Sequence, residues 1–244
     1  MKKRLAKIFH SRAAVNFVFF TFIVSIIFVV VQMIFAPVSD VDDTGERVKG
    51  EYVLMLVQCV LGVAAMALPG TLERRFNLTV PSRMLVLYAV FLYCAIYLGE
   101  VRAFYYNVPH WDTILHTFSG TMLGALGYSV IVILNNAERI PIHLSPVFVA
   151  FFTFCFAMTL GVIWEFYEAF IDTYFGTNMQ KFALEDGTQL VGRDALADTM
   201  KDLRVDMLGA AVMSVVGYIS LKYDKGWLDR LLLKKRNKNN GEKK

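Results

Sequence analysis

Acidic residues and one histidine gather at the ends of three apolar segments in the second half of this chain. A carboxylate inside a membrane segment costs about 2.5–3.5 kcal/mol, so a repeated set of them requires a function or a compensating partner. Carboxylates and imidazole suit magnesium, manganese, calcium or zinc, and closely spaced carboxylates also share protons. The residues are Asp112 and His116 in the first segment, Glu165, Glu168 and Asp172 in the second, and Asp198, Asp202 and Asp206 in the third.

Helical spacing places the members of each set on one face of a helix. Asp112 and His116 lie four residues apart, and Asp198, Asp202 and Asp206 recur at the same interval. The three acids that close the second segment oppose the helix dipole and repel one another, so a cation, shared protons or a facing arginine must compensate. Structural explanations remain open, because Asp112 and Asp198 can cap helices and His116 can form a hydrogen bond between helices.

The elements that must position these residues are long apolar segments. The chain of 244 residues is 56% hydrophobic, and six of its segments approach the length of about 20 residues that crosses a hydrocarbon core. We therefore predict an all-α, polytopic membrane bundle of about six transmembrane helices, forming one domain over 1–244. Prolines, among them Pro69 and Pro146, are expected at or between the helix ends. The predicted spans are 13–35, 52–68, 84–98, 111–134, 146–172 and 203–222.

The distribution of basic residues predicts the orientation of the bundle. With the N-terminus inside, 18 of the 25 Lys and Arg residues fall on the inner side, as the positive-inside rule requires. Both termini, including the basic tail 223–244, are therefore expected to be cytoplasmic. Basic ends beside transmembrane helices favour contact with the anionic lipid of the bilayer over contact with nucleic acid.

Connectivity brings the three polar sets to one face of the membrane. The fourth predicted helix runs inward from the external face, the fifth returns to it, and the sixth leaves from it. We therefore expect one site that binds a divalent metal ion and an anionic lipid headgroup. The expected roles are metal ligand for His116, Glu165, Glu168 and Asp202, catalytic base for Asp206 or Asp172, substrate contact for Arg193 and Arg204, and support for Asp112 and Asp198.

Two segments outside the spans have distinct interpretations. The long connection 173–201 is either a lid over the site or a solvated connector with a turn at Asp186 and Gly187. The segment that follows the last span contains Trp227 and several leucines before a run of lysines. We expect the tryptophan and these leucines to lie among the lipid headgroups as an interfacial anchor.

Three motifs resemble the YjdF-type family of bacterial integral membrane proteins, namely Trp111-Asp-Thr-Ile-Leu-His, Trp164-Glu-Phe-Tyr-Glu and Asp198-Thr-Met-Lys-Asp-Leu. The second half is more distantly similar to VanZ-type proteins, which are linked to glycopeptide-antibiotic tolerance. Their pattern has Asp-x-x-x-His opening one helix, an acid closing the next, and Asp-x-x-x-Asn-x-x-Gly in the last. Here Asp206 replaces the Asn and Glu168 stands where a Gln is usual, which makes the site more acidic. The resemblance implies a multi-pass protein of the bacterial plasma membrane and no settled reaction.

Three functions remain open from the sequence. The first is a cation-dependent enzyme that acts on a lipid or lipid-linked substrate at the outer leaflet, where a metal ion activates water or polarises a phosphoryl oxygen. The second is a proton- or ion-coupled transporter, although the inner halves of the last three segments are almost wholly apolar. The third is a non-enzymatic envelope scaffold in which buried acids and arginines tie the helices together.

Overall fold

The computed structural model describes residues 2–37, 49–135, 144–184 and 188–235, with side chains from residue 12 onward. Two short strands, β1 (Leu78–Thr79) and β2 (Lys234–Lys235), pair antiparallel, and the other elements are helical. The helices are α1 (Lys2–Phe35), α2 (Lys49–Phe76), α3 (Ser82–Leu92), the π-helix η1 (Tyr93–Val101), α4 (Phe104–Asn107), α5 (Trp111–Asn135), α6 (Pro146–Phe175), the 3-10 helix η2 (Asp194–Leu196) and α7 (Ala197–Lys222).

Six helical segments are long and apolar enough to cross a membrane, which confirms the predicted all-α polytopic bundle. The third of them is α3 continued by η1, and it runs past the predicted end at Leu98 to Val101. The prediction that a helix ends at Pro69 is wrong, because α2 continues through this proline to Phe76. A proline removes one backbone hydrogen bond, and a membrane helix tolerates this loss where its surroundings satisfy the freed carbonyl group.

Local sequence sets both ends of α6, which carries three acids of the predicted site. The Ser145 hydroxyl accepts a hydrogen bond from the backbone N–H of Phe148, and Pro146 occupies the first turn, where a missing N–H costs nothing. Gly176 follows the last turn with φ 66°, the left-handed conformation that ends many helices and that glycine adopts without strain. The helix therefore starts at Pro146, as predicted, and ends at Phe175, slightly beyond the predicted end at Asp172.

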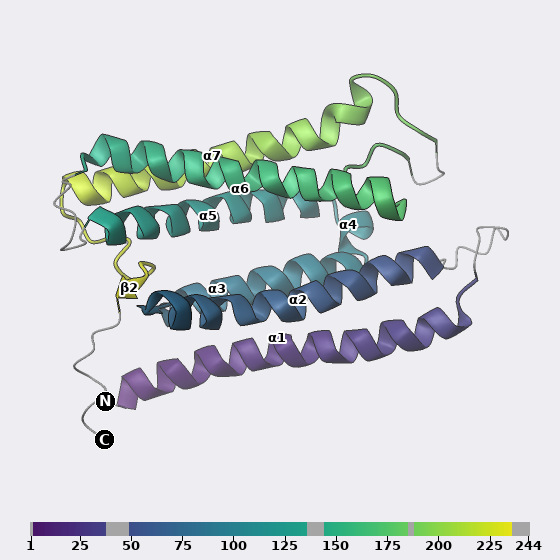
Figure 1. Ribbon diagram of the computed structural model, residues 1–244, viewed down its shortest axis with the longest axis horizontal. Coiled ribbons are helices and arrows are strands. Elements are labelled where there is room, and N and C mark those ends of the chain that lie inside the picture. The colour runs from purple at the N-terminus through teal and green to yellow at the C-terminus, as the bar shows by residue number, and fades with distance from the viewer. Residues whose placement is uncertain (1, 38–48, 136–143, 185–187, 236–244) are drawn as a thin grey trace.

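The spanning helices form two layers of three (Figure 1). In one layer α1 packs against α2 and against the third span, α3 and η1. In the other layer α5, α6 and α7 each pack against the other two. The two layers meet where α3 and η1 contact α5. All the acids that the sequence singled out belong to the α5–α7 layer.

Glycines let α7 approach both of its neighbours closely at the level of Asp206. A Cβ atom on Gly120 would lie 2.6 Å from the backbone oxygen of Asp206, and one on Gly209 would lie 2.7 Å from the backbone oxygen of Thr117. On α6, a Cβ atom on Gly161 would lie 2.8 Å from Oδ2 of Asp206. The absence of these side chains allows the Asp206 carboxylate to lie between α5 and α6.

We expect Gly120→Ala to destabilise the contact between α5 and α7, because the added methyl group meets backbone atoms that cannot rotate away. Overpacking of this kind costs about 1–3 kcal/mol. Gly70→Ala in α2 is the control, since no atom lies within 4 Å of its added methyl group and alanine favours the helix. Thermal unfolding in detergent measures both variants, and equal melting temperatures would contradict the close approach at Gly120.

The segment after α7 packs against the protein at the end of the bundle where α1 begins (Figure 1). Leu228 and Leu233 are buried, and the Leu233 backbone N–H donates a hydrogen bond to the Ser129 hydroxyl at 3.2 Å. The prediction that these leucines lie among lipid headgroups is therefore wrong, because they bury their apolar surface in the protein instead. Trp227 is exposed, as an interfacial residue would be. The rest of the basic tail, from residue 236, lies outside the described residues.

Candidate functional site

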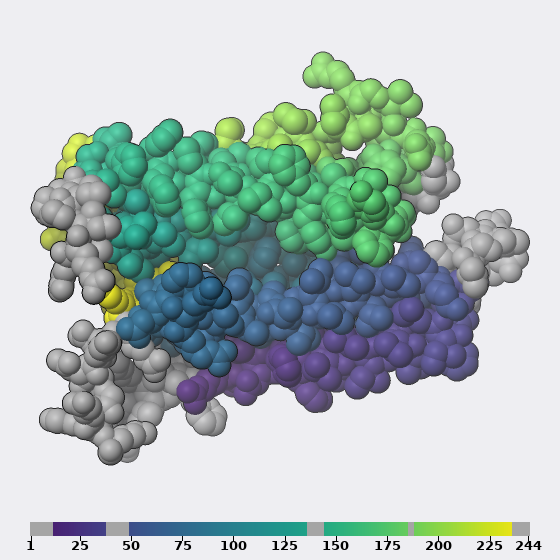
Figure 2. All heavy atoms as spheres, in the orientation of Figure 1, coloured from purple at the N-terminus to yellow at the C-terminus, as the bar shows by residue number. Residues whose placement is uncertain are grey.

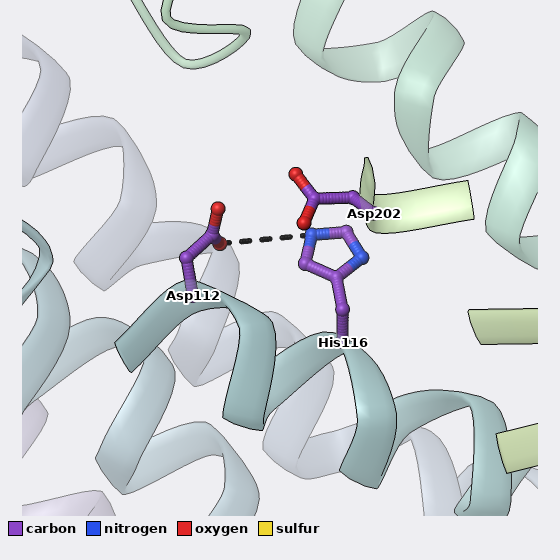
Figure 3. A group of neighbouring side chains, drawn as sticks. All are labelled: Asp112, His116 and Asp202. Carbon is purple, nitrogen blue, oxygen red and sulfur yellow. Dashed lines mark ion pairs between the residues drawn. The ribbon is translucent and has the colours of Figure 1, made fainter. Parts of the chain in front are cut away.

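Three side chains from α5 and α7 come together inside their layer, at the end of the bundle where α5 begins and α6 ends (Figure 3). One ligand atom from each of Asp112, His116 and Asp202 lies within 4.8 Å of the other two. His116 is 6% exposed and Asp202 is 1% exposed, so bulk water solvates neither charge. We call these three residues the central group. Among the described residues, this is a group whose ligand types and mutual proximity could hold a metal ion.

Both ring nitrogens of His116 face carboxylates. Nδ1 lies 3.3 Å from Oδ2 of Asp206, and Nε2 lies 3.6 Å from Oδ1 of Asp112. The Ser119 hydroxyl shares its single proton between Oδ1 of Asp206 at 3.2 Å and the backbone carbonyl of His116 at 2.8 Å. Metal-binding histidines usually donate one ring N–H to a carboxylate, which fixes the tautomer and leaves the other nitrogen for the ion. Asp206 and Ser119 hold His116 in this orientation, with Nε2 toward the two acids of the central group.

Two buried acids next to His116 have carboxylate oxygens that form no hydrogen bond with any described residue. These are both oxygens of Glu165, which is 4% exposed, and Oδ1 of Asp202. The Thr199 hydroxyl lies beside Glu165 without the geometry of a hydrogen bond. A buried carboxylate without a partner is strongly unfavourable as an ion, so each of these groups needs a proton or a cation.

Glu168 and Glu165 surround the central group from α6. The Glu168 Oε1 accepts a hydrogen bond from the indole N–H of Trp164 at 2.8 Å, and its charge interacts with those of Glu165, His116 and Asp112. Neither glutamate belongs to the tightly spaced central group, although the sequence interpretation named both as metal ligands. Asp112, which was expected to support the site, is instead a member of the group.

Asp172 organises the loop that follows α6. Its Oδ1 accepts hydrogen bonds from the Thr177 hydroxyl at 2.5 Å and from the Met179 backbone N–H at 2.7 Å, and its Oδ2 accepts one from the Gln180 backbone N–H at 2.9 Å. The residue is 7% exposed. These contacts occupy both oxygens, which supports a structural role in place of the catalytic one expected from the sequence.

We expect Asp172→Ala to release this loop, because hydrogen bonds to a charged group contribute about 1.5–3 kcal/mol each. Lys181 lies within the loop and provides a trypsin cleavage site, so limited trypsin digestion should cut after it at least about tenfold faster. The control is Asp194→Ala, which removes an exposed acid of η2 from the same connection. Equal cleavage rates in the wild type and Asp172→Ala would show that Asp172 does not hold the loop.

The same loop carries a lysine that the sequence interpretation missed. Nζ of Lys181 lies 2.5 Å from Oδ2 of Asp112 and 3.0 Å from Oδ2 of Asp198, so it joins the start of α5 to the start of α7. The sequence does contain one indication of its role. Lys181 is the only Lys or Arg between Arg139 and Arg193, and it follows the three acids of α6. Helical periodicity could not assign it, because it lies in a loop.

Electrostatics keep the Lys181 side chain charged. Burial lowers the pKa of its ammonium group, but the carboxylates of Asp112 and Asp198 outweigh burial and raise the pKa above its usual value. Lys181 also adopts φ 48°, a left-handed conformation that is uncommon for a residue with a side chain. The loop thus holds a permanent positive charge at the edge of an acidic site.

A second polar group lies where the two layers meet. Gln58 of α2 donates a hydrogen bond at 3.0 Å to Oε1 of Glu100, which lies in the π-helix η1. Burial raises the pKa of the Tyr105 phenol well above its usual value, and the nearby charges of Glu100, Asp112 and Glu168 raise it further. Charges from both layers therefore act on Tyr105 in α4. A π-helical segment often marks a functional site, so the irregular geometry of η1 agrees with its position here.

Arg193 and Arg204, the expected contacts of an anionic headgroup, lie at the surface. The Arg204 Nε donates a hydrogen bond to the backbone carbonyl of Met200 in its own helix. Arg204 falls midway between Asp202 and Asp206, about 200° around the helix from each, so it faces away from their buried side. Arg193 precedes η2 and is also exposed. Neither arginine lies among the buried acids.

The connection between α6 and α7 is folded against the start of α7. Ala183 and Gln189 form an antiparallel bridge, and the Gln180 side chain donates a hydrogen bond to the Thr199 hydroxyl at 3.1 Å. The turn predicted at 186–187 lies outside the described residues. The described part of this connection therefore covers the acid-bearing ends of α5 and α7 and brings Lys181 to them.

Comparison with known proteins identifies a family. Residues 17–223 match the model of a family described as predicted membrane protein (DUF2238). No curated protein and no solved structure matches the chain. The matched range contains the central group and every residue that surrounds it. Because the match covers well over half of the sequence, the chain belongs to the DUF2238 family of predicted membrane proteins.

Proposed function

We propose that the protein is a divalent-cation-dependent membrane enzyme that acts on the phosphoryl group of a lipid or lipid-linked substrate. The orientation of His116 is the observation that supports this most. When Nδ1–H is donated to Asp206, Nε2 directs a lone pair toward the carboxylates of Asp112 and Asp202. Lys181 pairs with Oδ2 of Asp112, but without a further cation the Nε2 lone pair, Oδ1 of Asp112 and the Asp202 carboxylate would still repel one another. A divalent ion would bind all three at once.

The buried acids around the central group also favour a bound divalent ion. A proton on Nε2 would make His116 a cation and would relieve part of the repulsion. The unpartnered oxygens of Glu165 and Asp202 would still carry negative charge in a medium that solvates it poorly. A doubly charged ion compensates more of this charge than one proton does. The imidazole and carboxylate donors fit magnesium, manganese or zinc.

The residues have distinct roles in this proposal. Asp112, His116 and Asp202 would hold the ion, which when bound would activate water or polarise a phosphoryl oxygen. Asp206 orients the imidazole. Glu165, whose oxygens have no hydrogen-bond partner among the described residues, would accept the proton of the water or hydroxyl group that attacks phosphorus. The P–O bond to the leaving alcohol would break, and Glu165 would pass the same proton to the leaving oxygen. The YjdF-type and VanZ-type resemblances imply no settled reaction, so these roles rest on the geometry.

The packing beyond the central group supports a site that is reached from one membrane face. An apolar cluster that includes Ala125, Tyr128, Ile131, Val149 and Met213 fills the α5–α7 layer toward its other end. No Asp or Glu occurs in the described residues 117–135, 146–164 and 207–222 of these helices, which favours an enzyme over an ion-coupled transporter. With the basic residues inside, the central group would face the outer leaflet of a bacterial plasma membrane.

The purified full chain, placed in nanodiscs of total bacterial lipid, tests the proposal. Lipids are extracted after incubation with Mn²⁺ or with a chelator and are analysed by mass spectrometry. We expect a new phosphorus-containing product with the metal, none with the chelator, and none for Asp202→Asn. Arg204→Gln, on the exposed face of the same helix, should retain activity. Product formation that survives chelation, or lipids that stay unchanged in the presence of the metal, would overturn the proposal.

A further inference from the structure

A crevice of about 130 Å³ opens between the two layers at the end of the bundle that holds the central group. Its lining is mostly apolar, and Figure 2 shows the seam between α2 and α6 along which it lies. Val53, Leu54 and Val57 form the wall on α2, where spacings of three and four residues place them on one helix face. Ile171 and Phe175 form the wall on α6.

Both walls of the crevice lead to polar residues of the site. On α2, Val57 is followed by Gln58, which is buried and donates its hydrogen bond to Glu100. On α6, Glu168 precedes Ile171 by three residues and therefore lies on the same side of the helix. These polar residues border the deep end of the crevice, whereas the polar end of a bound lipid would lie at its other end, near Gly50 and Thr177.

One loop joins the crevice to the central group. Thr177 lines the crevice and donates a hydrogen bond to Asp172, and Lys181, four residues later, contacts Asp112 and Asp198. The ammonium group donates to Oδ2 of Asp112 and to both oxygens of Asp198, so a phosphate would bind by replacing the longest of these contacts, to Oδ1 of Asp198 at 3.2 Å. The Lys181 side chain is 39% exposed, so an incoming acceptor can reach it. The loop that borders the crevice at Thr177 therefore also carries a cation that contacts Asp112 of the central group.

The membrane determines what fills such a crevice. Because six spanning helices place the bundle in lipid, a side opening near one end of the spans meets hydrocarbon chains just below the headgroups. Val57 lies about 10 Å along α2 from Gly50, which is the depth of the upper part of an acyl chain. Phosphate is the anion that a lipid presents at the top of this chain, and it would complement both Lys181 and a bound divalent ion.

We infer that the substrate is a glycerophospholipid whose acyl chain lies in the crevice between α2 and α6 and whose phosphate binds Lys181. The inference rests on the proposed function, because it names the substrate of the same site. It assigns substrate binding to Lys181 instead of the exposed Arg193 and Arg204. It also gives the α1–α3 layer a role in binding, through Val53, Leu54 and Val57 on α2.

Photocrosslinking tests the inference on the delipidated full chain. One probe is phosphatidylglycerol with a diazirine on an acyl chain, and the second is diacylglycerol with the same labelled chain and no phosphate. We expect the first probe to label peptides of α2 and α6 that contain Val53–Val57 and Ile171–Phe175. Labelling by phosphatidylglycerol should exceed labelling by diacylglycerol about tenfold, because one charge-assisted hydrogen bond raises the affinity by about this factor.

Four variants test binding of the acyl chain and binding of the phosphate separately. Val57→Trp fills the crevice and should reduce labelling by both probes about tenfold, whereas Val60→Trp, at a position 50% exposed on the same helix, should leave both unchanged. Lys181→Gln should reduce labelling by phosphatidylglycerol to the level of diacylglycerol, and Lys181→Arg should restore it. Labelling that is spread over exposed helix faces, or that is insensitive to Val57→Trp and Lys181→Gln, would overturn the inference.

Metal content, measured on the same samples, distinguishes failure of the glycerophospholipid inference from failure of the proposed function. If no divalent ion binds but both probes label the crevice as expected, the cation-dependent reaction is refuted and the lipid site stands. If the ion binds but labelling does not involve the crevice or Lys181, the metal site stands and the glycerophospholipid assignment is refuted.

Discussion

Asp202→Asn is expected to abolish metal binding and to stabilise the metal-free protein at the same time. Asp202 is 1% exposed and one of its oxygens has no partner among the described residues, so its charge destabilises the metal-free fold. Asparagine keeps the shape and removes the charge, which should stabilise the metal-free protein by about 1–3 kcal/mol. The affinity for the metal ion should fall by more than about 100-fold. Substitution of residues that only orient a metal ligand already lowers metal affinity by up to about 100-fold, and Asp202 is itself a proposed ligand.

Thermal unfolding with chelator and with Mn²⁺ measures both effects. The wild type should gain about 2.7 kcal/mol when the ion concentration is 100 times the Kd. Asp202→Asn should start from a higher melting temperature and show no gain. Asp194→Asn, which changes an exposed acid, should behave as the wild type. A variant at Asp202 that is less stable without metal and still stabilised by it would contradict the assignment.

Asp206→Asn is expected to weaken metal binding at least about 10- to 100-fold without touching a ligand. The carboxylate of Asp206 accepts the proton on Nδ1 of His116. An asparagine can turn its amide N–H₂ toward Nδ1, which would move the ring proton to Nε2. The nitrogen that faces Asp112 and Asp202 would then have no lone pair for the ion.

Nitrogen NMR of histidine-labelled, metal-free protein reports this change of tautomer, and calorimetric titration with Zn²⁺ reports the affinity. Ser119→Ala is the matched control, because it removes the second hydrogen bond of Asp206 and leaves its charge in place. Its effect on affinity should be smaller than that of Asp206→Asn. Unchanged affinity in Asp206→Asn, with the tautomer shifted to Nε2–H, would show that His116 does not bind the metal.

Much of the fold could be predicted because lipid allows few solutions. Apolar segments of spanning length must become helices, so their number and approximate bounds followed from composition. The exception at Pro69 shows the limit of this argument, since a membrane helix can continue through a proline when its surroundings satisfy the backbone. The arrangement in two layers depends on which faces touch, and contacts such as Gly120 against the Asp206 backbone carry no signal until both helices are placed.

The candidate site likewise has residues that the sequence predicted and residues that it could not predict. Helical spacing grouped Asp112 with His116 and Asp202 with Asp206, and the structure brings these two pairs together. The role of Asp172 could not be predicted, because its partners are backbone N–H groups of a loop. Lys181 likewise acts from that loop. Glu100, in the other layer, accepts a hydrogen bond from Gln58, and its charge acts on the same Tyr105 phenol as the charges of Asp112 and Glu168. Periodicity within one segment cannot show this relation.

The most direct test of the metal site is anomalous diffraction from crystals of the full chain grown with Zn²⁺. We expect one peak bound by Nε2 of His116 and by carboxylate oxygens of Asp112 and Asp202, at about 2.0–2.2 Å from each ligand atom. Nδ1 of His116 should keep its contact with Asp206. The absence of a peak at saturating Zn²⁺, or a peak held by Glu165 and Glu168 without His116, would contradict the account.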